Sequence, residues 1–152
     1  MSTPSLSHTY FGSTLTAGSY TTEGYDGGYA VLMQTTSVTT VSAGTAVSST
    51  ITIPANAQIL NFFIDQTQAE VVGAGTATLI NATIGTAAAG TQYLSATDVI
   101  GGGRASLAFT AAQLDAMSDV GTNTNVVFTF DPDGTILTTQ GIYQCTVVYA
   151  MK

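Results

Sequence analysis

The sequence predicts an all-β protein, a single-domain β-sandwich with a jelly roll as its leading topology, from three observations. Threonine is abundant, with 28 residues in a chain of 152, and its branched Cβ favours strands. Short segments in which apolar and small polar residues alternate recur along the chain, as in half-buried strands. Glycine, proline, asparagine and aspartate separate these segments at short intervals, a spacing typical of sandwiches.

About eight strands are expected between residues 29 and 152. Residues 29–41 form the first, either as one long strand or as two short ones. In 47–53 apolar residues alternate with Ser and Thr, and Pro54 ends that strand because proline cannot donate to a ladder. The other expected strands cover 57–66, 76–84, 104–109, 125–130 and 141–149, and residues 85–103 are expected to form a loop with short apolar pieces.

The segment 57–66 is apolar on both of its faces. Leu60, Phe62 and Ile64 alternate with Ile59 and Phe63. A strand with two apolar faces is expected at the centre of the fold, covered on both sides.

One short helix is expected after residue 109. Thr110 and Gln113 fit a capping box, in which the Thr hydroxyl accepts from the N3 amide and the Gln side chain reaches back. Leu114 and Met117 then share one face, and Gly121 ends the element. The helix is therefore one or two turns long.

Residues 1–28 show no periodic pattern and are expected to form an extended N-terminal arm, with the sandwich in 29–152. The arm combines glycines with aromatic residues, and its aromatic content is too high for a simple disordered linker. The rings need other surfaces to contact, either on their own domain or on a neighbouring subunit. The candidate interaction residues are Tyr10, Phe11, Tyr20, Tyr25 and Tyr29.

The charge composition excludes two classes of partner. Charged residues make up 7% of the chain, the net charge is −7, and the cations are Arg104 and Lys152. These are too few to form the cationic face that binds phosphate groups, so neither nucleic acid nor an anionic membrane surface is an expected partner.

No stretch reaches the roughly 20 apolar residues of a membrane span, and residues 1–8 lack the features of a signal peptide. A single cysteine excludes an internal disulfide, and synthesis in a reducing cytosol is expected.

Groups that could carry out catalysis are scarce. His8 stands alone in the predicted arm, and no second histidine could serve a Ser–His or Cys–His site. Cys145 lies in an apolar strand and is expected to be a small buried side chain. Asp115 and Asp119 are four residues apart with no cation nearby in the sequence, so both are expected to be solvated. No catalytic residue and no cofactor is expected, and the chain is predicted not to be an enzyme.

Asp131 and Asp133, followed by Gly134, are weak candidates for a calcium loop. The later ligands of such a loop are missing. Pro132 instead predicts a type I turn over residues 131–134, because its ring presets the second position of that turn. The turn accounts for these residues, so no metal is expected.

Several short pieces of sequence occur in a distinctive order between Ile51 and Tyr149. They are 51–57 (ITIPANA), 82–86 (ATIGT), 92–99 (QYLSATDV), Gly103-Arg104, and Gly141 leading into Val147-Val148-Tyr149. In this order they resemble small structural proteins of tailed phages that are encoded near the major capsid protein. The resemblance covers about two-thirds of the chain and contains no catalytic motif.

The resemblance implies a β-sandwich that decorates, cements or projects from the virion, at the capsid surface, with the major capsid protein as a partner. A polar but uncharged surface fits this role, because hydroxyls and amides are buried at far lower cost than ions. Three copies around a local three-fold axis would meet through head-to-tail interfaces that close into a ring. A homotrimer is therefore expected rather than a monomer.

Two other classes of virion protein stay open. A receptor- or glycan-binding domain of a fibre or spike would use surface loops such as 85–103, although the chain has no tryptophan to stack on a sugar. A neck or tail connector would use the same sandwich in rings of fixed number. The copy number in the particle separates both from a decoration or cement protein.

Overall fold

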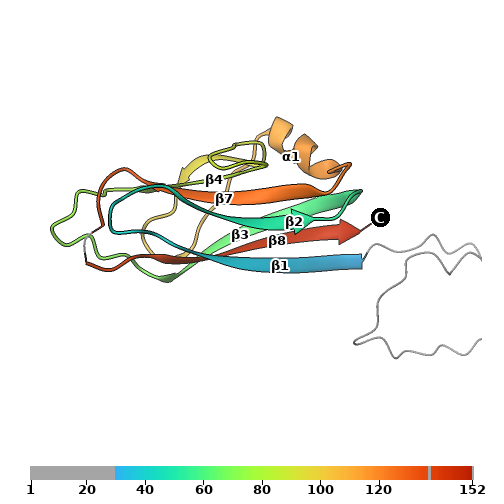
Figure 1. The fold of residues 1–152 in the computed structure, drawn as a ribbon. Helices are drawn as coiled ribbons and strands as arrows, with labels where there is room; N and C mark the ends of the chain where they lie inside the picture. Colours follow the sequence, from blue (N-terminus) through green and yellow to red (C-terminus); the bar gives the residue numbers. More distant parts are fainter. Residues whose placement is uncertain (1–29, 137, 152) are drawn as a thin grey trace, which may run out of the picture.

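The computed structural model describes residues 30–136 and 138–151, which form two four-stranded antiparallel sheets that face each other (Figure 1). The predicted all-β sandwich with one short helix is confirmed. The predicted arm, residues 1–28, lies outside the described residues, so the predicted domain boundary remains a prediction. The elements are β1 Ala30–Thr39, β2 Val47–Ile53, β3 Ala57–Gln68, β4 Ile80–Gly85, β5 Leu94–Asp98, β6 Gly103–Arg104, α1 Ala111–Ser118, β7 Thr124–Pro132 and β8 Ile142–Met151.

The strand order is that of a jelly roll, as the sequence predicts. The sheets run β1-β8-β3-β6 and β2-β7-β4-β5. Each strand therefore pairs with its counterpart counted from the other end of the chain: β1 with β8, β2 with β7, β3 with β6, and β4 with β5. One long antiparallel ribbon, reversed between β4 and β5 and wound across two sheets, produces this order.

Aromatic side chains from both sheets meet in the core. Phe62 of β3 and Phe128 of β7 pack edge to face with ring centroids 6.0 Å apart. Phe130 of β7 stacks on Tyr143 of β8 at 4.5 Å. Such pairs contribute about 0.5–1.5 kcal/mol beyond the burial of their area. Because each pair joins one sheet to the other, these contacts hold the two layers together.

β3 is covered on one side only, so the prediction of a strand covered on both sides is wrong. Its inward side chains Ile59, Phe62 and Ile64 are buried, whereas Leu60 is 44% exposed and Phe63 is half-buried. A β-bulge after Ile59 shifts the register against β8, which changes the alternation at Leu60. β3 is central within its sheet, between β8 and β6, but its second face points out of the sandwich.

Two predicted strands are shorter than expected, and the predicted loop contains strands. β4 begins at Ile80 and not at residue 76, and β6 covers only Gly103–Arg104 of the predicted 104–109. Residues 76 and 77 donate instead to the carbonyl of Thr135. β5 and Gly103 lie within 85–103. The observed bounds of β4, β5 and β6 depend on pairing with segments distant in the sequence, which local patterns do not reveal.

The predicted turn at residues 131–134 is also displaced. Asp131 and Pro132 belong to β7, where Pro132 lies opposite Ile80 of β4. The bend therefore begins at Asp133. Proline is tolerated here because it is the last residue of the strand.

The capping box of α1 forms as predicted. Gln113 N donates to Thr110 Oγ1, and Thr110 N donates to Gln113 Oε1 at 2.9 Å. Gln113 and Met117 are buried, but Leu114 is 53% exposed, because the Gln113 amide takes an inward position and donates to the Thr91 carbonyl and the Ser95 hydroxyl. In the described part of the chain, no helix is long and apolar enough to cross a bilayer.

Candidate interaction surface

The outward side of the β1-β8-β3-β6 sheet carries a group of apolar side chains, here called the apolar outer face. Strand alternation directs these side chains away from the core. Val148 of β8 is paired with Met33 of β1 on one side and with Asn61 of β3 on the other. Leu60 is the residue before Asn61. Val31, Met33 and Leu60 are 59%, 65% and 44% exposed. The apolar outer face consists of Val31, Met33, Leu60, Phe63 and Val148.

The first half of β1 is open on both sides. Val31, Leu32 and Met33 are consecutive, and all three are more than 40% exposed, although neighbouring strand residues point to opposite faces. Further along the strand Val38 is buried. Among the described strands, β1 lies at an edge and pairs only with β8. Its sequence AVLMQTTSVT contains no lysine, proline or bulge, the usual protections of a free edge. This part of β1 therefore offers main-chain groups as well as apolar side chains.

Charge on this sheet is confined to one neutralised pair. Arg104 Nε and Nη2 donate to Asp65 Oδ1 and Oδ2 at 2.8 and 3.0 Å. The guanidinium also lies 4.5 Å from the ring centroid of Phe63. The hydrogen bonds from Arg104 lower the pKa of Asp65. Arg104 is the only Lys or Arg in the described ranges, so no other cation stands on the sheet there.

The outward side of the β2-β7-β4-β5 sheet is richer in hydroxyl groups, although one hydroxyl pair, Thr35 with Thr146 at 2.9 Å, also lies on the outward side of the other sheet. Ser48 and Thr129 share a hydrogen bond of 2.8 Å between their hydroxyls, and Thr52 donates to Asn125 Oδ1 at 2.9 Å. Cross-strand pairs of this kind stabilise a sheet without apolar contact. The hydroxyl outer face, as it is called below, consists of Ser48, Thr50, Thr52, Asn125 and Thr129. Thr129, which accepts from Ala89 N, and Val127, opposite Thr50, point to this side but are buried.

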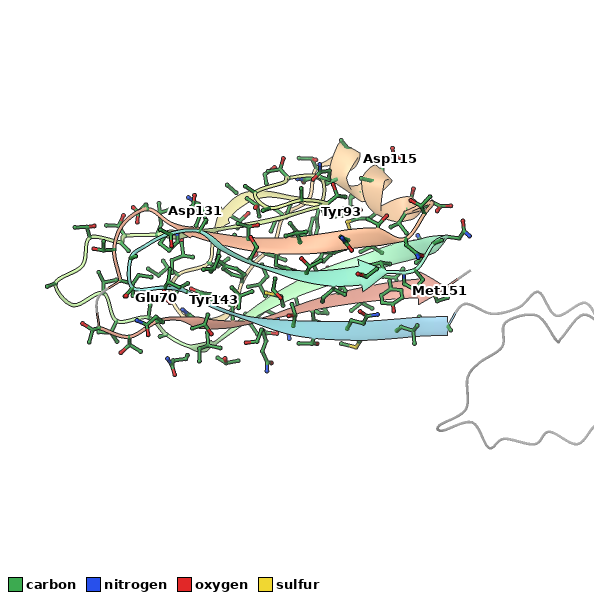
Figure 2. All side chains as sticks on the ribbon, in the orientation of Figure 1. Glu70, Tyr93, Asp115, Asp131, Tyr143 and Met151 are labelled. Atoms are coloured by element: carbon green, nitrogen blue, oxygen red, sulfur yellow. The ribbon has the colours of Figure 1, made fainter. Side chains whose placement is uncertain are left out.

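A hydrogen-bonded cluster around the Glu70 carboxylate lies at the end of the sandwich opposite Met151 (Figure 2). Tyr143 Oη donates to Glu70 Oε2 at 3.0 Å, and Gln66 Nε2 donates to the same oxygen and to Tyr143 Oη. Burial and the neighbouring Glu70 raise the pKa of Tyr143. Glu70 Oε1 and Gln66 Oε1 have no hydrogen-bond partner among the described residues. Within the described ranges, no three His, Cys, Asp or Glu side chains come together as a metal site.

The predicted interaction residues Tyr10, Phe11, Tyr20, Tyr25 and Tyr29 lie outside the described residues, as does His8. The described chain begins at Ala30, which pairs with Met151 at the end of β8. Val31 and Met33 follow directly. Residues 1–29 therefore connect to the sandwich immediately beside the apolar outer face.

The weak metal candidates Asp131 and Asp133 have different surroundings. Asp133 Oδ1 accepts from the amides of Thr78 and Leu79 at 2.7 and 3.0 Å, and Oδ2 accepts from the Thr78 hydroxyl. These bonds lower the pKa of Asp133. Asp131 lies in β7 opposite Asn81 and is exposed. Asp133 therefore anchors the segment that leads into β4.

Cys145 is fully buried in β8, as predicted. Burial, with a smaller contribution from Asp65, raises the pKa of its thiol to about 12. The thiolate is the reactive form of cysteine. Cys145 is therefore a residue of the buried core whose surroundings favour the thiol over the thiolate.

The sequence analysis did not identify the apolar outer face. The run Val31-Leu32-Met33 was a signal of this face in the sequence. A strand with one buried and one solvated side alternates apolar and polar residues, whereas this run has three apolar residues in succession. Its significance depends on β1 being at an edge, which follows only from pairing with β8 at the far end of the chain. Likewise, Phe63 was predicted to be buried because both faces of 57–66 are largely apolar. The bulge after Ile59, which puts Ile59 on the inward side with Phe62, was not foreseen.

One solved structure shares this architecture. A chain described as "Cyanophage Pam1 capsid asymmetric unit" aligns with a TM-score of 0.60 and 20% sequence identity, over 93% of this chain and 99% of that chain. At this identity the likeness establishes the fold and does not by itself assign a function. No protein-family model and no curated protein matches the sequence.

Proposed function

We propose that this chain is a non-enzymatic structural protein of a tailed-phage virion, which decorates or cements the capsid by binding the major capsid protein and neighbouring copies of itself. The observation that carries the proposal is the apolar outer face on a charge-poor jelly roll. The likeness to a chain of a cyanophage capsid supports it.

The energetics suit a protein that acts by binding. Fully burying a Val, Leu or Met side chain stabilises a complex by about 1.5–3 kcal/mol relative to leaving it exposed. Val31, Met33 and Leu60 supply such side chains. The sheet that carries them has no unpaired cation to desolvate among its described residues. Contacts of this kind, made only in the assembled shell, stabilise the shell by mass action.

The proposed assembly is a homotrimer at the capsid surface, formed from chains made in the host cytoplasm. Head-to-tail interfaces between three copies close into a ring. In this proposal Tyr10, Phe11, Tyr20, Tyr25 and Tyr29 supply further contacts, either to the shell or to neighbouring copies. Nucleic acid and membranes are not partners, because the sequence lacks the cations that bind phosphate.

The copy number in purified particles tests this function. Quantitative mass spectrometry of the particle gives the ratio of this chain to the major capsid protein. We expect a ratio of about one, or a simple fraction such as about one third, because a protein that tiles a symmetric shell follows its symmetry. A handful to a few dozen copies would indicate a fibre, spike, neck or tail part instead. Absence from the particle would overturn every virion role.

A further inference from the structure

We propose that the hydrogen-bonded cluster around Glu70 is a binding site for Ca²⁺, with Glu70 Oε1 and Gln66 Oε1 as its side-chain ligands. The inference concerns the isolated chain and does not depend on a virion role. It rests on two buried acceptor oxygens that have no donor among the described residues. It rests also on a carboxylate that no cation of the described ranges pairs with.

The donors of the cluster all serve one oxygen of the carboxylate or the phenol that bonds to it. Tyr143 Oη donates to Glu70 Oε2 at 3.0 Å (Figure 2), and Gln66 Nε2 donates to the same carboxylate oxygen. Gln66 Nε2 also donates to Tyr143 Oη at 3.0 Å. Glu70 Oε1 and Gln66 Oε1 are buried and receive no hydrogen bond from the described residues. A buried acceptor without a donor is destabilising, and a bound ion is one of the groups that satisfy such atoms in folded proteins.

The free oxygen of Gln66 follows from the carboxylate beside it. Gln66 is 9% exposed, and its amide group meets a carboxylate oxygen, which only accepts hydrogen bonds. The Nε2 group therefore faces Glu70, and Oε1 is left as the second acceptor. Exchanging the two amide atoms would bring Gln66 Oε1 against Glu70 Oε2, and two acceptors would then be in contact. Gln66 thus places an enclosed, unpartnered oxygen in the cluster.

The chain leaves room for the Glu70 carboxylate inside the end of the sandwich. A Cβ at Gly141 would collide with Glu70 Oε2 and would lie 3.0 Å from Tyr143 Cε2. The main chain at this position is held, because Gly141 N donates to Thr40 Oγ1 at 2.8 Å. A larger residue at position 141 would therefore displace the carboxylate. β3, the segment after it and the start of β8 together build the site.

The charge of the cluster is negative and is not balanced by a neighbouring cation. Burial, and then the charges of Glu70 and Asp98, raise the pKa of Tyr143, so two carboxylates act on the same phenol. In the described ranges the one ion pair joins Arg104 to Asp65, and Arg104 is the only Lys or Arg there. A cation at Glu70 Oε1 would therefore be attracted and would displace no described partner.

The donor atoms favour Ca²⁺ over other ions. Ca²⁺ takes about six to eight oxygen ligands, carboxylate and amide oxygens among them, at about 2.3–2.6 Å in flexible geometry. Gln66 and Glu70 are joined by a hydrogen bond, so one ion reaches both free oxygens directly or through a bound water. The described ranges contain no site with three acidic ligands. With a single carboxylate as ligand, we expect half-saturation at about 0.1–1 mM Ca²⁺.

Thermal unfolding of the full chain, first treated with a chelator and then titrated with Ca²⁺, tests the site. We expect Tm to rise by about 3–6 °C at about ten times the half-saturating concentration, because an ion that binds only the folded chain stabilises it. Mg²⁺ at the same concentration should raise Tm by less than about half as much, because it demands octahedral geometry and releases water reluctantly. No rise with Ca²⁺, or an equal rise with Mg²⁺, would overturn the proposal.

Two variants with the same change in net charge locate the ion. Glu70→Gln removes the charged ligand, and Asp131→Asn, the matched control, removes an exposed carboxylate. We expect Glu70→Gln to lose the rise in Tm with Ca²⁺ and Asp131→Asn to keep it within about 1 °C. The same response in both variants would overturn the proposal, because it would reflect the overall charge of the chain. Loss of the rise in Asp131→Asn alone would also overturn it.

Luminescence of Tb³⁺, which replaces Ca²⁺ at oxygen sites, provides a measurement on the unmodified chain that stays valid if Glu70→Gln does not fold. The chain has seven tyrosines and no tryptophan, and the hydroxyl of Tyr143 is bonded to Glu70. Excitation of tyrosine should therefore sensitise the emission of bound Tb³⁺, and excess Ca²⁺ should abolish that emission. Absence of sensitised emission, or emission that excess Ca²⁺ leaves unchanged, would contradict the proposal.

Discussion

The two outer faces of the sandwich follow the same alternation but differ in how many exposed apolar side chains they carry. On the hydroxyl outer face, Ser48 and Thr129 bond to each other, and Thr52 bonds to Asn125. On the apolar outer face, Met33 is 65% and Leu60 is 44% exposed. Exposed apolar side chains that gather on one face of a protein mark an interaction site. The comparison teaches that the two-residue period of a strand decides which side chains point away from the core. The chemistry of those side chains then indicates which face a partner covers.

The largest expected effect is on the free energy of unfolding, and it distinguishes the buried side of β3 from the side that belongs to the apolar outer face. Phe62 and Phe63 are neighbours in β3, but Phe62 is 2% exposed and packs on Phe128. We expect Phe62→Ala to lower the free energy of unfolding by about 3–5 kcal/mol. Phe63→Ala, the matched control, should cost about 1 kcal/mol. Denaturant titration of both variants measures the difference, and equal losses would show that the two sides of β3 have been assigned wrongly.

The next effect compares the two outer faces in binding. A carboxylate at position 60 would have to be desolvated in the proposed interface, which costs several kcal/mol when it is unpaired. We therefore expect Leu60→Asp to weaken binding to particles stripped of this protein by at least about tenfold, equivalent to about 1.4 kcal/mol. Thr50→Asp, which places the same charge on the hydroxyl outer face, should bind like the unchanged chain.

Stability measurements on the same two variants keep this test specific. Both positions are exposed, so both variants should unfold within about 0.5 kcal/mol of the unchanged chain. Equal weakening of binding by Leu60→Asp and Thr50→Asp would remove the distinction between the faces. Weakening by Thr50→Asp alone would assign docking to the hydroxyl outer face.

The smallest effect concerns the charge pair beside the apolar outer face. Arg104 lowers the pKa of Asp65 through its hydrogen bonds and its charge. Arg104→Ala should therefore raise the pKa of Asp65 toward its ordinary value of 3.8, as measured by NMR titration of the carboxyl carbon. Asp133 is an internal control, because Thr78 and Leu79 hold its pKa low. An unchanged pKa of Asp65 would contradict the pairing.

The same pair predicts the sign of a pH dependence. The pKa of Asp65 is lower in the folded chain than in the unfolded chain, so the pair contributes stability above about pH 4, near the unfolded value. This contribution is lost as the pH falls through the folded pKa. In Arg104→Ala the stability should therefore fall less steeply with decreasing pH than in the unchanged chain. Thermal unfolding of both chains between about pH 2 and pH 6 measures this difference.

The features that the sequence predicted well are local. The alternation in β2, the break at Pro54 and the capping box of Thr110 and Gln113 depend on residues close together in the chain. The jelly roll was predicted from the number and spacing of such segments, and the strand order agrees.

The features that escaped prediction depend on distant segments. The open edge of β1 follows from its pairing with β8, for which Ala30 and Met151 come together. The bulge that exposes Leu60 follows from the register of β3 on β8. The cluster of Glu70 and Tyr143 joins residues 73 positions apart. None of these pairings leaves a pattern within one segment, so the run Val31-Leu32-Met33 did not by itself reveal the apolar outer face.

Oxidative footprinting on the intact particle tests most directly that the apolar outer face docks on the capsid. Leu60→Met and Thr50→Met place an oxidisable reporter on each face, since exposed methionine is converted to its sulfoxide by peroxide. We expect both reporters to oxidise in the free protein and only the reporter at position 50 to oxidise in the particle. Met117, which is 3% exposed, should resist in both. Oxidation at position 60 as fast in the particle as in the free protein would contradict the account.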